Sequence, residues 1–129
     1  MSGPAMARAR KLLAACVAAV AVLGVTAAGS TAAPKPVKVA VADFYFGPSA
    51  VTIRKGGSVK WIWSSANTYP HDVHLKKGPS GLKNKGSYST KTTAVTGAQF
   101  QKTFTTAGTY KFICTIHPTE MKMTVTVKK

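Results

Sequence analysis

Acidic residues are scarce in this 129-residue sequence: there are three, against 18 lysines and arginines, and the formal charge is +15. Hydrolysis by paired carboxylates needs two acids at one site, so this chemistry is disfavoured. Only 16% of residues are charged and 45% are hydrophobic, which excludes a disordered basic tail. The lysines are spread over nearly every expected strand, and we interpret them as a solubilising surface, with no nucleic-acid partner expected.

A long apolar run occurs once, near the N-terminus. Arg8, Arg10 and Lys11 precede the uncharged residues 12–28, and small residues then lead up to Ala33. This order predicts a secretory signal peptide over residues 1–33, followed by a single domain over residues 34–129. The run is short for a membrane span, which needs about 20 apolar residues. An uncleaved anchor is one alternative, and lipidation at Cys16 is another that we disfavour because most of the run follows Cys16.

Cysteine is equally scarce, and two residues cannot form a disulfide framework. Cys16 lies in the predicted leader, so residues 34–129 retain only Cys114. An exported protein meets an oxidising compartment, where a single cysteine has no intramolecular partner. Cys114 is therefore a buried inert thiol, an intermolecular bridge, a reactive thiol or a metal ligand.

Sustained helical periodicity is absent from residues 34–129, where apolar and polar residues alternate instead. We expect Phe44 and Phe46 to continue the alternation of the first strand, and residues 76–97 to be mostly loop with one short strand at most. Seven or eight short strands with frequent turn signals predict an all-β fold, a two-sheet antiparallel β-sandwich. The clearest alternating segments are residues 37–41, 51–53, 59–63, 110–114 and 123–127.

Four candidate metal ligands stand out. Cys114 and His117 are three residues apart, Met121 follows four residues later, and His71 lies upstream in a Pro-His loop. Each alone has an ordinary structural explanation, since cysteine and methionine are common core residues and His-Pro is common in turns. Two imidazoles, a thiolate and a thioether together suit copper in both Cu(I) and Cu(II) states, and the combination favours a copper site.

Three neighbouring residues are assigned other roles. His74 is expected to be a structural or surface histidine, because the four-ligand set is complete without it. Met123 shares strand parity with Val125 and is expected to pack in the core. Glu120 is a hard oxygen donor that would favour Cu(II), and we expect it to be exposed in its loop.

Residues 108–118 resemble the C-terminal copper loop of cupredoxins, and residues 70–74 resemble their upstream histidine loop. The similarity is greatest to the amicyanin and plastocyanin group. It implies a Greek-key β-sandwich with one type 1 copper per chain. It also implies that His71, Cys114 and His117 are the equatorial ligands and Met121 the axial one.

The sequence departs from this pattern at two positions. Asp72 replaces the usual asparagine, whose side chain ties the two ligand loops together in the family. Three residues rather than two separate His117 from Met121, a spacing found in azurin-like loops.

The expected function is that of an exported, non-enzymatic electron carrier with His117 as a solvent-exposed electron port ringed by apolar residues. A copper chaperone or storage protein is the alternative. It is disfavoured because such proteins often have methionine-rich sites, whereas Met121 and Met123 are the only methionines in residues 34–129. A Cys-His nucleophilic enzyme lacks a third group to orient the base. The +12 charge of residues 34–129 predicts a redox partner with an acidic docking surface. We expect a monomer, with membrane contact only if the leader is retained or lipidated.

Overall fold

The computed structural model describes residues 32–129 and, before them, only Gly3, Gly24 and Gly29, so the predicted signal peptide lies outside the described residues. Residues 32–129 fold into eight strands and one short 3₁₀ helix. The elements are β1 (Val37–Ala42), β2 (Tyr45–Gly47), β3 (Ala50–Arg54), β4 (Ser58–Trp63), β5 (His74–Lys77), η1 (Lys85–Tyr88), β6 (Gln99–Thr103), β7 (Gly108–Ile113) and β8 (Lys122–Lys128).

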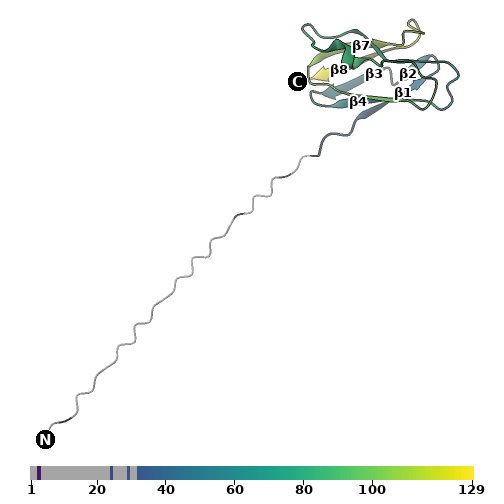
Figure 1. The fold of residues 1–129 in the computed structure, drawn as a ribbon. Coiled ribbons are helices and arrows are strands. Elements are labelled where there is room, and N and C mark those ends of the chain that lie inside the picture. The colour runs from purple at the N-terminus through teal and green to yellow at the C-terminus, as the bar shows by residue number, and fades with distance from the viewer. Residues whose placement is uncertain (1–2, 4–23, 25–28, 30–31) are drawn as a thin grey trace. The chain divides into compact units, whose positions relative to one another are not determined.

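The strands form two four-stranded sheets stacked as a sandwich (Figure 1), with the orders β2-β1-β4-β6 and β3-β8-β7-β5. The predicted all-β sandwich is confirmed. The expectation of purely antiparallel sheets is wrong, because β1 pairs with β4, and β3 with β8, in parallel. Alternation reveals which side chains face inward, but it does not reveal which strands become neighbours.

The core lies between the two sheets and is made by the predicted inward faces. Along β4 the buried residues Val59, Trp61 and Trp63 alternate with half-buried neighbours, which is the two-residue period of a strand. Trp61 stacks on Phe100 and also contacts Phe112 of the opposite sheet, with ring centroids 5.4 and 5.0 Å apart. Aromatic rings therefore bridge the two layers.

One local expectation needs correction. Phe44 does not continue β1, because the chain turns at Asp43 and Phe44 to form the β1–β2 hairpin. Phe44 is exposed there, whereas Phe46 is buried as expected. The stretch at residues 78–98 is mostly loop, as expected, and contains the helix η1 but no named strand. Its only described β-pairing is an isolated bridge between His71 and Ala94.

Three loops meet at one end of the sandwich. Because β1 and β4 are parallel, the β1–β2 turn and the loop after β4 leave their sheet at the same end. Hydrogen bonds from Ser64 N–H to the Val41 carbonyl, and from Thr115 N–H to Asp72, join these loops to one another and to the β7–β8 loop. Among the residues that the structure describes, there is no helix long and apolar enough to cross a membrane.

Candidate metal centre

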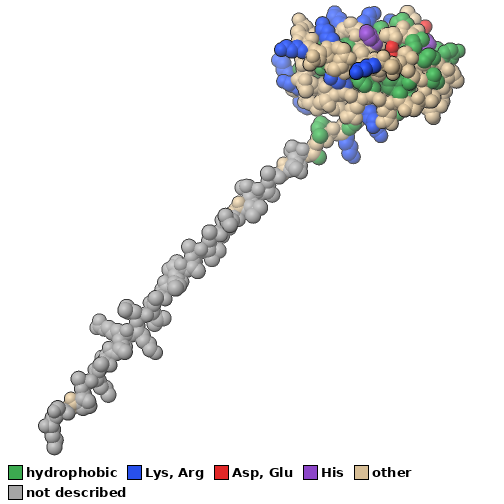
Figure 2. All heavy atoms as spheres, viewed as in Figure 1, with side chains coloured by type: hydrophobic (Ala, Val, Ile, Leu, Met, Phe, Trp, Pro, Cys, Tyr) green, Lys and Arg blue, Asp and Glu red, His purple; other side chains and the backbone are tan. Residues whose placement is uncertain are grey.

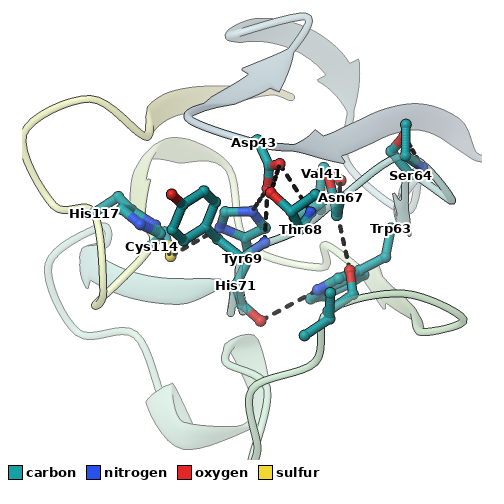
Figure 3. A network of polar contacts seen from close by, with 12 residues as sticks. Val41, Asp43, Trp63, Ser64, Asn67, Thr68, Tyr69, His71, Cys114 and His117 are labelled. Carbon is teal, nitrogen blue, oxygen red and sulfur yellow. Dashed lines mark hydrogen bonds and ion pairs between the residues drawn. The ribbon is translucent and has the colours of Figure 1, made fainter.

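Three of the predicted ligands converge at this end of the sandwich (Figure 3). The Cys114 sulfur lies 3.9 Å from Nδ1 of His71 and 3.8 Å from Nδ1 of His117. All three candidate ligand atoms lie within 4.8 Å of one another. His71 is 43 positions before Cys114 and 46 before His117 in the sequence. The fold thus assembles one sulfur and two imidazole nitrogens into a single cluster.

The spacing of these atoms fits a metal ion. A trigonal metal bound at about 2.0 Å to nitrogen and about 2.3 Å to sulfur places the two atoms about 3.7 Å apart, by the bond lengths of Zn sites. The observed sulfur-to-nitrogen distances are close to this value. The His₂Cys donor set is also that of trigonal copper sites. The residues present therefore fit a copper ion.

His71 is fully buried, and a carboxylate fixes its ring. Its Nε2 lies 2.7 Å from Oδ1 of Asp43. A hydrogen on Nε2 donated to Asp43 leaves Nδ1 unprotonated and directed at the Cys114 sulfur, as metal-bound histidines require. Asp43 thus determines which nitrogen of His71 is available to a metal.

Asp43 also organises the loop that carries His71. Its carboxylate accepts hydrogen bonds from the N–H and hydroxyl of Thr68 and from the N–H of Tyr69, at 2.9, 3.0 and 3.2 Å. Desolvation on its own would raise the pKa of Asp43. The hydrogen bonds from His71, Thr68 and Tyr69 outweigh it and lower the pKa to about 2.

The backbone of His71 is held from other directions. The Trp63 indole N–H donates to the His71 carbonyl at 3.2 Å, and His71 exchanges two backbone hydrogen bonds with Ala94. The buried Asn67 amide donates to the carbonyls of Val41 and Val95 and pins the loop between β4 and β5. His71 is therefore constrained at its ring and at its main chain before any metal binds.

His117 lies in different surroundings. It is half-exposed, and the Phe44 ring meets it edge-on at a centroid distance of 5.1 Å. Tyr69 packs beside Phe44, with ring centroids 5.2 Å apart, and its ring also meets His117 edge-on at 6.1 Å. Phe44 adopts a backbone φ of 70°, which is rare for a bulky residue and is found most often at functional sites. The apolar surroundings expected for His117 are observed.

The loop between Cys114 and Met121 folds back on itself. The Cys114 N–H donates to the Met121 carbonyl at 3.1 Å, and the Met121 N–H donates to the His117 carbonyl at 2.9 Å. Both Cys114 and Met121 are fully buried. The three-residue spacing after His117 is accommodated within this closed loop, and it brings the backbone of Met121 next to that of Cys114.

The roles expected for the neighbouring residues agree with the structure. The Met123 sulfur accepts a hydrogen bond from the Trp61 indole at 3.1 Å, so Met123 is a core residue. Glu120 is exposed, and a hydrogen bond from the Thr119 hydroxyl lowers its pKa. His74 is exposed on β5 and is not part of the three-residue cluster.

Asp72 ties the two ligand loops together. Its carboxylate accepts hydrogen bonds from the N–H of Thr115 at 2.7 Å and from the hydroxyl of Thr115 at 2.5 Å. Asp72 follows His71, and Thr115 follows Cys114, so this contact fixes the two ligand-bearing segments against each other. The carboxylate performs the role that the resemblance gives to asparagine.

Sequence reasoning did not identify Asp43, Asn67, Phe44 or Tyr69 as parts of the site. One signal was available for Asp43, which is one of only three acids in the chain. The other two acids, Asp72 and Glu120, directly neighbour predicted ligands in the sequence. Because two of the three acidic residues are next to predicted ligands, the third, Asp43, could also have been expected near the site.

Comparison with known proteins decides the family. Residues 34–128 match the family model described as copper binding proteins, plastocyanin/azurin family. The chain belongs to this family. It is 32% identical over 99 residues to amicyanin-alpha from Methylorubrum extorquens, a match that covers 70% of this chain and 66% of that protein. It is 33% identical over 86 residues to plastocyanin from Scenedesmus fuscus, covering 64% and 86% of the respective chains.

Solved structures of this family have the same architecture. A reduced amicyanin variant superposes with a TM-score of 0.58 at 28% identity, covering 76% of this chain and 87% of that one. A fern plastocyanin variant superposes with a TM-score of 0.60 at 27% identity, covering 71% of this chain and 100% of that one. A Cu-containing nitrite reductase from Thermus scotoductus also gives 0.60 at 27% identity, but this chain spans only 23% of its length. The cupredoxin fold inferred from the copper loops is confirmed, and the chain is a copper-binding protein.

Proposed function

We propose that this protein is an exported single-electron carrier with one type 1 copper held by His71, Cys114 and His117 as equatorial ligands and Met121 as the axial ligand. The observation that carries the proposal is the cluster of one sulfur and two Nδ1 atoms at trigonal spacing. One imidazole of the cluster is fully buried and the other reaches the surface. That is the arrangement needed to hold a redox centre and still exchange electrons.

The bound copper would supply a one-electron step between Cu(I) and Cu(II). The chain's own contribution is to keep the ligand atoms in place during that step. Asp43 and the Trp63 indole fix His71, Asp72 fixes the loop of Cys114, and burial keeps water away from the Cys114 sulfur. Since a His₂Cys site with a weak axial sulfur suits both oxidation states, little rearrangement is required.

Three residues compete for the axial position, and the contacts favour Met121. The Met123 sulfur already accepts the Trp61 hydrogen bond, and the Glu120 carboxylate is exposed. Met121 is fully buried, and its main chain is hydrogen-bonded to both Cys114 and His117. These contacts keep its side chain in the neighbourhood of the two ligands.

His117 is the proposed electron port. The surface around it is apolar, and four large side chains there or nearby are exposed by 41 to 56%: Phe44, Tyr45, Tyr69 and Ile116. Figure 2 shows hydrophobic side chains gathered at one end of the domain, while lysines and arginines lie over much of the face in view. An apolar patch of this kind suits brief contact with a redox partner. The +12 charge of residues 34–129 favours a partner with an acidic surface.

Export is part of the proposal and rests on the sequence of residues 1–33. A positive segment, an uncharged run and small residues precede the domain. We propose that the leader is removed and that the domain acts as a monomer outside the cytoplasm. N-terminal sequencing of the protein recovered from the producing cell tests the cleavage directly.

The visible spectrum of the copper-loaded protein tests the function. Thiolate-to-copper charge transfer should make the oxidised protein intensely blue or green, and reduction should bleach it reversibly. Cys114→Ala should remove the colour. A colourless Cu(II) form of the unmodified protein contradicts the proposal, and ready loss of copper to a chelator would instead support the chaperone or storage alternative.

A pair of methionine variants tests the axial ligand. Met121→Leu should keep the colour and raise the reduction potential, because a weak donor to Cu(II) is lost. Met123→Leu should leave the potential unchanged, while the unpaired Trp61 N–H lowers the free energy of unfolding by about 1–3 kcal/mol. If Met123→Leu shifts the potential and Met121→Leu does not, the axial assignment is wrong.

A further inference from the structure

A hollow lined by lysines lies on the outer face of the sheet β3-β8-β7-β5. Its volume is about 510 Å³, and it extends over β5, β7 and β8. The half-buried Ile113 and Thr124 share the outer face with the lysines, and four lysines contribute the charge: Lys76, Lys77, Lys111 and Lys122. The hollow therefore combines a small floor, with Ile113 as its apolar side chain, and a positively charged rim.

The strand register concentrates this charge at a cost in stability. Lys77 lies directly opposite Lys111 in the β5–β7 pair. Lys111 lies opposite Thr124, and Lys122 is two residues before Thr124, so Lys122 is a diagonal neighbour of Lys111. Like charges directly opposite each other destabilise a sheet. Lys38 and Lys60 are also opposed, on the other sheet, so what distinguishes this face is that four lysines line one hollow.

Within the described part of the chain no acidic group forms an ion pair with the rim, although Glu120, hydrogen-bonded to Thr119, lies within electrostatic reach of Lys122. Asp43 bonds to His71, Asp72 to Thr115, and Glu120 to Thr119. The ion pair between Asp43 and His71 is the only one among the described residues, and no lysine takes part in it. The four ammonium groups therefore remain available to an anionic partner.

The hollow is directly connected to the metal centre. Ile113, in its floor, precedes Cys114 in the chain, and Lys122, on its rim, follows Met121. Ile113 and Lys122 are also paired in register across β7 and β8. A partner bound here would lie one residue away from two of the proposed ligands.

We propose that the hollow formed by β5, β7 and β8 is a docking site for the acidic surface of a redox partner protein. This inference rests on the proposed function. Carboxylate side chains projecting from a protein can enter a concave site and meet the lysines, while apolar groups between them cover the floor. A flat anionic membrane cannot follow the hollow in this way. The proposal thus assigns the docking role to the four lysines of this hollow rather than to the positive charge of the whole surface.

The chain provides a matched control for the test. Lys38 and Lys60 are also directly opposite each other, on the outer face of the other sheet. The double variants K77Q/K111Q and K38Q/K60Q remove the same charge from two cross-strand lysine pairs, the first between antiparallel strands and the second between parallel strands. Each variant is loaded with copper, and its blue colour and reduction potential are measured first. The probe is a soluble cytochrome c of net negative charge, and its electron transfer is followed by stopped flow over a range of ionic strengths.

K77Q/K111Q should reduce the bimolecular rate at low ionic strength by about tenfold and flatten its salt dependence, whereas K38Q/K60Q should change it by less than about twofold. Chemical shift changes in the Cu(I) protein on addition of polyglutamate should map to residues 74–77, 109–113 and 122–124. Equal effects of the two double variants overturn the proposal. The proposal is also overturned if K77Q/K111Q binds anionic phospholipid vesicles more weakly than the unmodified protein does, while its chemical shift response to polyglutamate is unchanged.

The two proposals fail in different ways. If the unmodified protein binds no copper or shows no colour, the proposed function is wrong. If both double variants are blue and have the wild-type potential but react equally fast, the electron carrier stands and the docking site is wrong.

Discussion

The two histidines of the candidate centre present the same atom, Nδ1, to the Cys114 sulfur but lie in opposite surroundings. His71 is fully buried, its Nε2 is held by a carboxylate, and its main chain is hydrogen-bonded to Trp63 and Ala94. His117 is half-exposed, and the rings of Phe44 and Tyr69 meet its ring edge-on. Polar contacts fix the first ring, whereas apolar contacts surround the second.

This difference shows that one histidine of a centre can provide a rigid ligand while the other provides access for a partner. A ligand held by hydrogen bonds keeps its geometry when the metal changes charge, because those bonds do not depend on the metal. A ligand at the surface shortens the path to a partner, and an apolar surround lets the partner approach without displacing strongly bound water. The predictions below test whether this division between His71 and His117 is real.

The largest expected effect comes from removing each imidazole in turn. His117→Gly should fold, and added imidazole should enter the open position and restore the blue colour. His71→Gly should lower the free energy of unfolding by about 3 kcal/mol or more, since it leaves a cavity in the core. Added imidazole should not restore the blue colour of this variant. Denaturant unfolding and absorption titrations measure both properties. Equal rescue of the two variants would remove the distinction.

Asp43 should have the next largest effect. Asp43→Ala removes the acceptor for His71, and loss of such a partner typically weakens metal binding by about 10- to 100-fold. Asp43→Asn keeps an oxygen acceptor for His71 Nε2 and should bind copper more tightly than Asp43→Ala. Competition with a chelator gives both affinities. Wild-type affinity in the alanine variant would mean that packing alone positions His71.

Phe44 allows a smaller test from the His117 side. Glycine adopts a φ of 70° without strain, so Phe44→Gly should change the free energy of unfolding by less than about 1 kcal/mol. It should also speed copper loss to a chelator several-fold, because the ring beside His117 is gone. Phe44→Ala removes the ring but keeps the strained backbone, and it should be the less stable of the two. The reverse order of stability would contradict the role assigned to the backbone.

The smallest effect concerns acid stability of the copper-free protein. The pKa of Asp43 is lowered to about 2, so its folded form favours the carboxylate. The stabilisation is complete above the ordinary carboxyl pKa near 4 and is lost as the pH falls from about 4 towards 2. Asp43→Asn should lack this part of the acid transition. An NMR titration of the Asp43 carboxyl carbon with a midpoint near 4 would show that the hydrogen bonds do not hold.

The candidate site was more accessible to sequence reasoning than the sheet pairing. Cys114, His117 and Met121 are close together in the chain, and in combination with His71 they favoured a metal site. The alternation in β4 and β8 likewise identified the buried faces, because a strand has a fixed two-residue period. The parallel pairs β1–β4 and β3–β8 depend on where distant strands meet, which local periodicity does not encode.

By itself the sequence determined the donor atoms, the all-β class and the excess of positive charge, since each is a property of residue type or local spacing. Only the tertiary structure decided that Asp43 holds His71, that Phe44 turns outward beside His117, and that Lys77 faces Lys111. These contacts join residues up to 73 positions apart. Hydrogen bonds and charge effects act over a few ångströms in space, and the chain brings such residues together only when the two sheets pack.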